Sequence, residues 1–346
     1  MICNISRVKG LNECRQKEYN REVKRLMPTR DAEPLMTGEA YHAGTAHLFA
    51  TGNVEDTVRL TEETYRKRLE GQTILQAEMP LIEREILIAK TAVRKYAIHY
   101  PKEDFQVIMP EIAFCIPLPN TLHHCHYFHK LAHPDIPFED CPNHYVPILP
   151  DTKPNGCLQP HYFKGRVDAL LSWKGMIWIF EQKTSGLQTD NWWRQWLLDI
   201  QLSGYTYGVE KATGIRPQGV LLNKIRKPKK NEDIHKWEQS NIFEREPFLR
   251  SNADLKRFET QFIKQCNAYE DAMFNDNIWM NTAACMNWNR TCYFHESCTS
   301  HGDSGLSAFK TRPDDYVEDE YYTILGIPNP SKPVESKEPV NGTDAV

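Results

Sequence analysis

The stretch Gly165–Ser185, GRVDALLSWKGMIWIFEQKTS, decides the fold. It is built mostly from Val, Leu, Ile, Trp and Phe, and it is interrupted once, at Lys174 and Gly175. Glycine readily adopts the positive φ that a tight two-residue turn requires. The stretch therefore predicts a β-hairpin of two apolar strands.

Three ionisable residues stand in this hairpin, where burial without a partner is costly. With a two-residue turn, Trp173 pairs with Met176, and counting outward sets Asp168 opposite Glu181. Opposed side chains have Cβ atoms roughly 5 Å apart, so the two carboxylates repel unless a cation lies between them. Lys183 shares the strand face of Glu181, because side chains alternate along a strand. The hairpin thus predicts that one Asp, one Glu and one Lys converge.

Two interpretations fit the three groups. One is a buried ion-pair cluster without a ligand, since structural ion pairs also occur in sheets. The other is a magnesium site for phosphodiester hydrolysis, in which carboxylates hold the cation and the lysine stabilises developing charge or helps to deprotonate a water. Asp followed by Glu-x-Lys on a hairpin resembles the signature of the PD-(D/E)XK nuclease superfamily, with Val167 in place of the usual Pro.

The segment 189–214 has apolar residues at helical spacing and ends in glycine, which predicts one amphipathic helix. It contains Gln201 and Tyr205, which lie four residues apart and therefore on one helical face. They match the Q-x-x-x-Y motif of the RecB-like branch of the superfamily. The resemblance implies that both residues support the metal site or the DNA backbone.

A second motif of that branch, G-x-x-x-H at the start of a helix, fits Gly38 and His42. The resemblance implies that His42 is a metal ligand for Mg²⁺ or Mn²⁺ beside the two hairpin carboxylates. His47 is the alternative, on a different face of the same helix. Glu111 lies in a predicted strand over 106–118. It matches a position where relatives carry an acid that either supports the metal ligands or binds a second metal.

Ten cysteines, no signal-peptide-like start and no apolar run of transmembrane length favour a cytosolic protein with reduced thiols. Cys285, Cys292 and Cys298 are clustered, and three thiols need a fourth to hold zinc or an iron–sulfur cluster. Cys14 is the candidate. One N-terminal and three C-terminal cysteines resemble the iron–sulfur staple of certain RecB-like nucleases, which implies a [4Fe-4S] cluster; structural zinc and unligated thiols are the alternatives.

The motifs extend from residue 14 to residue 298, which favours one α/β domain over 1–325. The resemblance implies a restriction-endonuclease-like core, a central mixed β-sheet flanked by helices, with N- and C-terminal helical parts joined by the iron–sulfur cluster. A His/Cys-rich insertion occupies about 119–163 and is either a zinc site or a loop near the DNA path. The Pro-, Ser- and charge-rich segment 326–346 predicts a disordered tail.

The net charge of −4 gives no argument for a nonspecific DNA-binding surface. A local basic cluster follows a predicted strand in 216–230 and is either a phosphate-contacting loop or a solvated one. It comprises Lys224, Arg226, Lys227, Lys229 and Lys230. Three tryptophans, Trp192, Trp193 and Trp196, either stack on bases or belong to the core.

The resemblance implies a metal-dependent deoxyribonuclease, in its usual form an exonuclease, acting in recombination, repair or phage DNA metabolism. The expected location is the cytoplasm of a bacterium or of a phage-infected host. DNA is the expected partner, and because no P-loop is present, any unwinding requires a separate helicase or recombination protein. No membrane partner is expected. The alternatives are a catalytically inactive nuclease fold that binds DNA, and a zinc-dependent nucleic-acid-binding protein built on the insertion.

Overall fold

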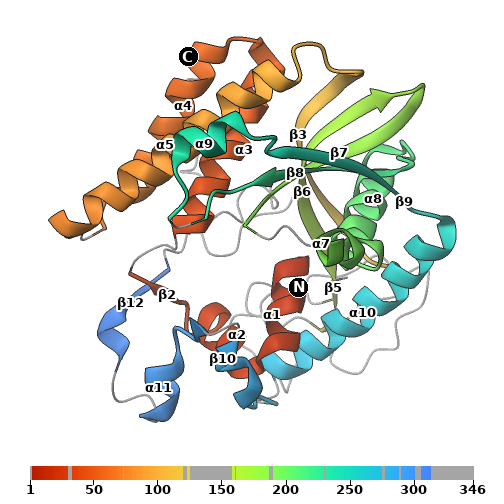
Figure 1. Ribbon diagram of the computed structural model, residues 1–346. Coiled ribbons are helices and arrows are strands. Elements are labelled where there is room, and N and C mark those ends of the chain that lie inside the picture. The colour runs from red at the N-terminus through yellow and green to blue at the C-terminus, as the bar shows by residue number, and fades with distance from the viewer. Residues whose placement is uncertain are drawn as a thin grey trace, which may run out of the picture.

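The structure is a computed structural model (Figure 1). It describes residues 2–29, 33–72, 74–119, 123–124, 158–159, 161–186, 190–229, 231–274, 277–287, 290–300 and 305–312. Most of the predicted insertion and all of the predicted tail over 326–346 lie outside these residues, so those two predictions and the domain boundary at 325 stay predictions.

The described chain is built from both helices and strands. The α-helices are α1 (Ile5–Glu13), α2 (Arg15–Glu22), α3 (Glu33–Thr51), α4 (Val54–Leu69), α5 (Met79–His99), α7 (Asp190–Arg194), α8 (Ile200–Thr213), α9 (Ile234–Gln239), α10 (Asn252–Phe274) and α11 (His295–Thr299). The longer strands are β3 (Phe105–Pro117), β6 (Tyr162–Trp173), β7 (Met176–Ser185), β8 (Gly219–Arg226) and β9 (Phe243–Leu249). The short strands are β1 (Ile2–Cys3), β2 (Leu26–Pro28), β4 (His123–His124), β5 (Leu158–Gln159), β10 (Met286–Asn287), β11 (Arg290–Thr291) and β12 (Phe309–Thr311).

The central sheet is mixed. Its path is β1-β6-β7-β8-β9, and β3 pairs with β6. The pairs β3–β6, β6–β7 and β8–β9 are antiparallel, whereas β7–β8 and β1–β6 are parallel. Helices cover both faces: α1, α7, α8 and α10 pack on one side, and α3, α4, α5 and α9 on the other (Figure 1). This arrangement confirms the predicted mixed sheet flanked by helices.

The hairpin turn forms as predicted. Lys174 and Gly175 both have positive φ, at 51° and 74°, and Trp173 pairs with Met176. The ladder then ends at the pair formed by Ala169 and Phe180, one pair short of the two acids. The expectation that the acids form a ladder pair was therefore wrong, because the two strands separate just before them.

A physical cause of this separation lies in the other strands. β3 pairs with β6 along its whole length, so β1 and β7 share the remaining edge of β6. β1 occupies the start of that edge, at residues 162–163, and β7 occupies only its end, at residues 169–173. β7 meanwhile continues along β8 as far as Ser185. The two hairpin strands thus form a fork whose arms pair with different neighbours.

The predicted helix over 189–214 is two helices with a break between them. Asp199 ends the first segment by capping α8, where its side chain accepts a backbone N–H. Trp192 and Trp196 are buried in the core, which supports the core interpretation of these tryptophans. Gly214, in the left-handed conformation at φ 71°, ends α8 as predicted.

The N- and C-terminal parts of the described chain lie together at one end of the molecule (Figure 1). β2 and β12 form an antiparallel pair, and Glu22 on α2 forms ion pairs with Arg7 at 2.8 Å and with Arg312 at 3.1 Å. Burial alone would raise the pKa of Glu22, but the two arginines outweigh it and lower the pKa to about 2. Direct contacts therefore join the two parts.

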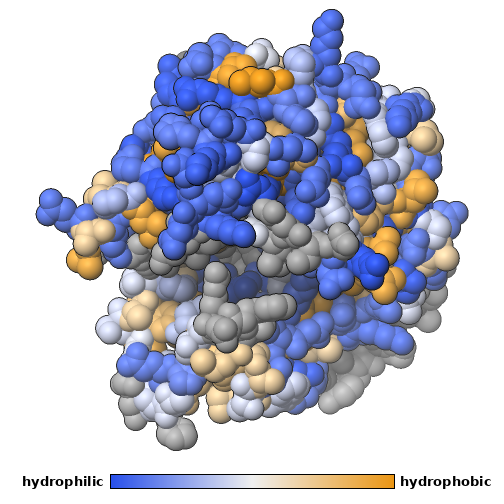
Figure 2. Space-filling model, viewed as in Figure 1, coloured by the Kyte–Doolittle hydropathy of each residue, from blue (hydrophilic) through white to orange (hydrophobic). Residues whose placement is uncertain are grey.

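Figure 2 shows that this face of the molecule is mostly hydrophilic and that its apolar residues form separate patches. Within the described residues, none of the helices combines the length and the apolar character needed to cross a bilayer.

The ion pairs of Glu22 predict a pH-dependent stability. Because its pKa is lower in the folded than in the unfolded chain, the stabilisation is complete above about pH 4.5 and is lost as the pH falls toward 2. Glu22→Gln is expected to lower the free energy of unfolding by about 3 kcal/mol at neutral pH, with a smaller difference at pH 3. Urea denaturation at both pH values measures this.

The control is Glu63→Gln on the exposed face of α4, where the carboxylate lies 3.7 Å from Arg59. An exposed pair of this kind contributes little, so the control should match the wild type within about 0.5 kcal/mol. Equal destabilisation of the Glu22 variant at both pH values would contradict the assignment.

Candidate active site

The hairpin acids and the lysine meet at the fork. Asp168 follows the end of the β6–β7 ladder, and its Oδ2 accepts the backbone N–H of Gln182 at 2.7 Å. Glu181 and Lys183 lie on the arm of β7 that continues along β8. The ammonium group of Lys183 donates to Glu181 Oε1, as expected for residues on one strand face. The structure thus brings the three predicted groups together.

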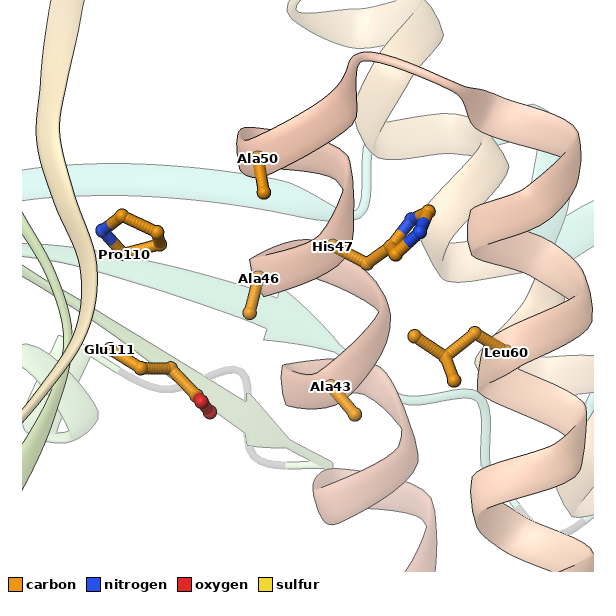
Figure 3. A pocket seen from close by; sticks show the side chains of 7 residues that line it. All are labelled: Ala43, Ala46, His47, Ala50, Leu60, Pro110 and Glu111. Atoms are coloured by element: carbon orange, nitrogen blue, oxygen red, sulfur yellow. The ribbon is translucent and has the colours of Figure 1, made fainter.

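Helix α3 brings His42 to the same point. His42 Nδ1 lies 3.0 Å from Asp168 Oδ1. His47 lies instead with its Nδ1 2.9 Å from Thr57 Oγ1, and Figure 3 shows it directed toward α4. Gly38 and His42 are in the interior of α3, which begins at Glu33, so the expected position at the start of a helix was wrong.

The electrostatics of the fork depend on burial and on charge pairing. Burial lowers the pKa of His42, but the charge of Asp168 outweighs it and leaves the pKa raised. Burial raises the pKa of Asp168, but His42 and Lys183 outweigh it and leave the pKa lowered. Burial, with the charge of Asp168, raises the pKa of Glu181 to about 7 despite Lys183. Burial is therefore the main reason that Glu181 holds its proton more tightly than an exposed glutamate does.

Gln182, the middle residue of Glu-x-Lys, is a site residue that sequence reasoning missed. Alternation turns its side chain to the face opposite Glu181 and toward α3. There it is buried, accepts the hydroxyl of Tyr41 at 3.0 Å and donates to Thr45 Oγ1 at 2.6 Å. Tyr41 and Thr45 flank His42 on α3. Gln182 therefore fixes the helix that carries His42, and the available signal was a polar residue in an apolar run.

Gln182→Leu is expected to lower the free energy of unfolding by about 2 kcal/mol or more, because it leaves two buried hydroxyl groups without their partner. Chemical denaturation measures this. Gln218→Leu is the control, since Gln218 is exposed and should tolerate the change within about 0.5 kcal/mol. Equal stability of the two variants would show that the Gln182 amide does not hold α3.

The helix α8 carries the other predicted pair. Gln201 Nε2 donates to the hydroxyl of Tyr205 at 2.7 Å, so the two residues share a helical face as predicted. The preceding turn places the ring of Trp196 5.9 Å from Lys183 Nζ. α8 therefore begins beside the lysine of the fork.

Glu111 lies on β3 across from the fork. Its neighbours Pro110 and Ile112 pair with Ala169 and Val167, so Glu111 stands opposite Asp168. It has positive φ, at 44°, which is uncommon for a residue with a side chain. Its carboxylate lies 3.7 Å from Arg166 Nη1. It borders a pocket of about 380 Å³ between α3 and β3, and Figure 3 shows the carboxylate directed toward α3.

The chain matches the description "PD-(D/E)XK nuclease superfamily" over residues 3–299. The chain belongs to the PD-(D/E)XK nuclease superfamily. This confirms the family predicted from the hairpin and covers every motif from Cys14 to Cys298. No curated protein matches the chain. The Asp and the Glu-x-Lys of this superfamily member lie on adjacent strands of the mixed sheet.

Most described side chains of the predicted basic cluster form ion pairs with acidic residues. Arg226 forms a bidentate contact with Glu232 at 2.9 Å, and Lys227 lies 2.9 Å from Glu85. Lys224 is buried, with its ammonium group 4.9 Å from the ring centroid of Trp192 and 3.4 Å from Glu244. Lys229 is exposed, and Lys230 lies outside the described residues. The expected phosphate-contacting role does not fit the three paired residues.

The four predicted cluster cysteines of this superfamily member come close together. Cys14, between α1 and α2, accepts the backbone N–H of Asn281 at Sγ, 3.5 Å away. Burial raises the pKa of Cys292 and of Cys298, and charge on the other cysteines of the set adds to the rise. The backbone N–H of Cys292 donates to the carbonyl of Cys285 at 2.8 Å.

The described residues hold no ready-made metal site, since no three of their His, Cys, Asp or Glu side chains are arranged to hold a metal ion. At the fork, His42 contacts Asp168, and Lys183 contacts Glu181. These are charge contacts: His42 Nδ1 lies 3.0 Å from the carboxylate of Asp168 but forms no hydrogen bond of acceptable geometry there.

Proposed function

We propose that the protein is a metal-dependent deoxyribonuclease whose active site is the fork. The observation that carries the proposal is the junction itself, where Asp168, Glu181 and Lys183 converge in a member of this nuclease superfamily. The donor set fits Mg²⁺ or Mn²⁺, since both prefer carboxylate oxygens. The buried carboxylate of Glu181 supports the fit, because burial, with Asp168 beside it, raises its pKa to about 7, and a bound cation would offset both effects.

A divalent metal, when bound, would polarise the scissile phosphate and acidify a water. Asp168, Glu181 and His42 would hold that metal, with Glu111 as a further acid across the strand. The Gln182 N–H orients the Asp168 carboxylate, and the Gln182 side chain fixes the helix of His42. Lys183, whose ammonium group donates to Glu181, would stabilise the negative charge that develops on the phosphate oxygens during attack.

The finer assignment follows from resemblance. The Q-x-x-x-Y and G-x-x-x-H motifs resemble those of the RecB-like branch, which supports exonuclease action on DNA in recombination, repair or phage DNA metabolism. Gln201 and Tyr205 would then support the DNA backbone beside Lys183. A separate helicase or recombination protein would be the partner, in the cytoplasm of a bacterium or of a phage-infected host.

We further propose that Cys14, Cys285, Cys292 and Cys298 hold a [4Fe-4S] cluster. The proximity of the four thiols supports this, as does the N–H of Asn281 directed at Cys14 Sγ, since N–H donors stabilise thiolate sulfur in such clusters. Structural zinc is the alternative for the same four ligands.

Lys183→Ala is expected to lower turnover by orders of magnitude while DNA affinity stays nearly unchanged, because the lysine acts on charge that develops during reaction. Asp168→Asn should abolish cleavage. Hydrolysis of end-labelled linear and closed circular DNA with Mg²⁺ measures both variants and separates exonuclease from endonuclease action. Lys236→Ala, at an exposed lysine on α9, is the control with wild-type activity. Wild-type protein that binds DNA but cuts neither substrate would favour the inactive nuclease fold.

Anaerobically purified protein is expected to be brown and to contain about four irons per chain. Replacing Cys14 or Cys292 with Ser should remove the colour and much of the soluble yield. Cys3→Ala and Cys266→Ala are the controls, because these buried thiols lie in the main core cluster, outside the proposed ligand set. Metal analysis measures iron and zinc together. Colourless protein with one zinc per chain would assign the four thiols to structural zinc.

A further inference from the structure

The turn between α7 and α8 presents two leucines to solvent. Leu197 is 60% exposed and Leu198 is 78% exposed. Both lie in the segment 194–198, named here the leucine turn, at the junction of the two helices (Figure 1). Single exposed leucines are ordinary. Two consecutive ones on one turn expose a contiguous apolar surface, and its contact with water is unfavourable.

The leucine turn is held firmly from behind. Trp192, just before it, and Trp196, within it, are buried in the main core cluster. The buried guanidinium of Arg250 donates from Nη2 to the carbonyl of Trp196 at 2.7 Å and from Nε to Ser203 Oγ at 3.0 Å. Asp199 then caps α8 directly after the turn. The leucines are therefore presented by a fixed backbone, as an inserting side chain requires.

The leucine turn lies beside the proposed reaction centre. The ring of Trp196 lies 5.9 Å from Lys183 Nζ, and Leu197 is the next residue along the chain. DNA bound at Lys183 would therefore lie close to this turn. Arg194, at its start, is exposed and has no ion-pair partner among the described residues, so its charge suits a phosphate.

The side chains of the leucine turn suit the base-paired end of a DNA duplex better than single-stranded DNA. Single strands are bound by stacking bases on aromatic rings, but here the rings of Trp192 and Trp196 face the core and aliphatic side chains face outward. Aliphatic side chains act on DNA as wedges that enter a base step and unstack it. Building on the proposed nuclease function, we propose that Leu197 and Leu198 are a wedge that opens the terminal base pair of duplex DNA beside the active site.

The test compares three end-labelled substrates of one sequence: a single strand, a fully paired blunt duplex, and a duplex whose terminal pairs are mismatched. The variant is the double substitution Leu197→Ser and Leu198→Ser, assayed in the full chain with Mg²⁺. Cleavage of the paired duplex should fall about ten-fold or more relative to the single strand, equivalent to about 1.4 kcal/mol. The mismatched duplex should be cut at the wild-type rate, because its end is already open.

Ile98→Ser on α5 is the control, since Ile98 is 76% exposed on a helix of the opposite face. It should leave all three rates unchanged. If the leucine variant lost cleavage rate equally on all three substrates, the wedge proposal would be overturned, and the turn would instead contact the DNA strand in every substrate. Unchanged rates on all three would also overturn it. In both cases the wild type still cuts DNA, so the proposed nuclease function survives, whereas a wild type that cuts none of the substrates would remove that function itself.

Discussion

The separation of β6 from β7 after one short ladder is the constraint on which the site depends. When an antiparallel ladder ends in a protein interior, the next backbone groups need other partners. Here the carboxylate of Asp168 takes the N–H of Gln182 in place of a strand. The acid therefore completes the hydrogen bonding of the sheet and, by the same contact, is fixed beside Glu181. Fold and site therefore share one interaction.

Burying two carboxylates at such a junction is unfavourable unless positive charge lies close by. Lys183 comes from the same strand as Glu181, but His42 comes from a helix more than a hundred residues earlier in the chain. The side-chain amide of Gln182 brings this helix to the fork, because its hydrogen bonds to Tyr41 and Thr45 hold α3 against β7. Glu-x-Lys is thus a two-sided motif: Glu181 and Lys183 face the fork, and Gln182 faces α3.

Local chemistry explains which predictions held. The turn at Lys174 and Gly175, the strand faces of the hairpin and the helix end at Gly214 each depend on neighbours within a few residues, and each could be predicted from sequence. The end of the β6–β7 ladder could not, because β1 occupies the start of the β6 edge that β7 would otherwise follow, while β7 continues along β8.

The basic cluster illustrates the same limit. The acid that pairs with Lys227 is Glu85, on a helix far away in the chain, so proximity in sequence gave no sign of it. Asp199 likewise resembled a polar residue within one helix, whereas its cap divides that helix in two. Long-range partners therefore decide the sites that local patterns leave open.

The thiol cluster raises a question of order in folding. A metal cluster that alone joined the two ends of a chain would have to close a very long loop, and the entropy of that closure would oppose it. In this structure the β2–β12 pair and the ion pairs of Glu22 with Arg7 and Arg312 already bring the ends together. Asn281 donates its backbone N–H to Cys14 Sγ and its side-chain amide to the carbonyl of Glu13. Ordinary contacts thus join the two ends of the chain, and the proposed cluster would tighten a junction that they already form.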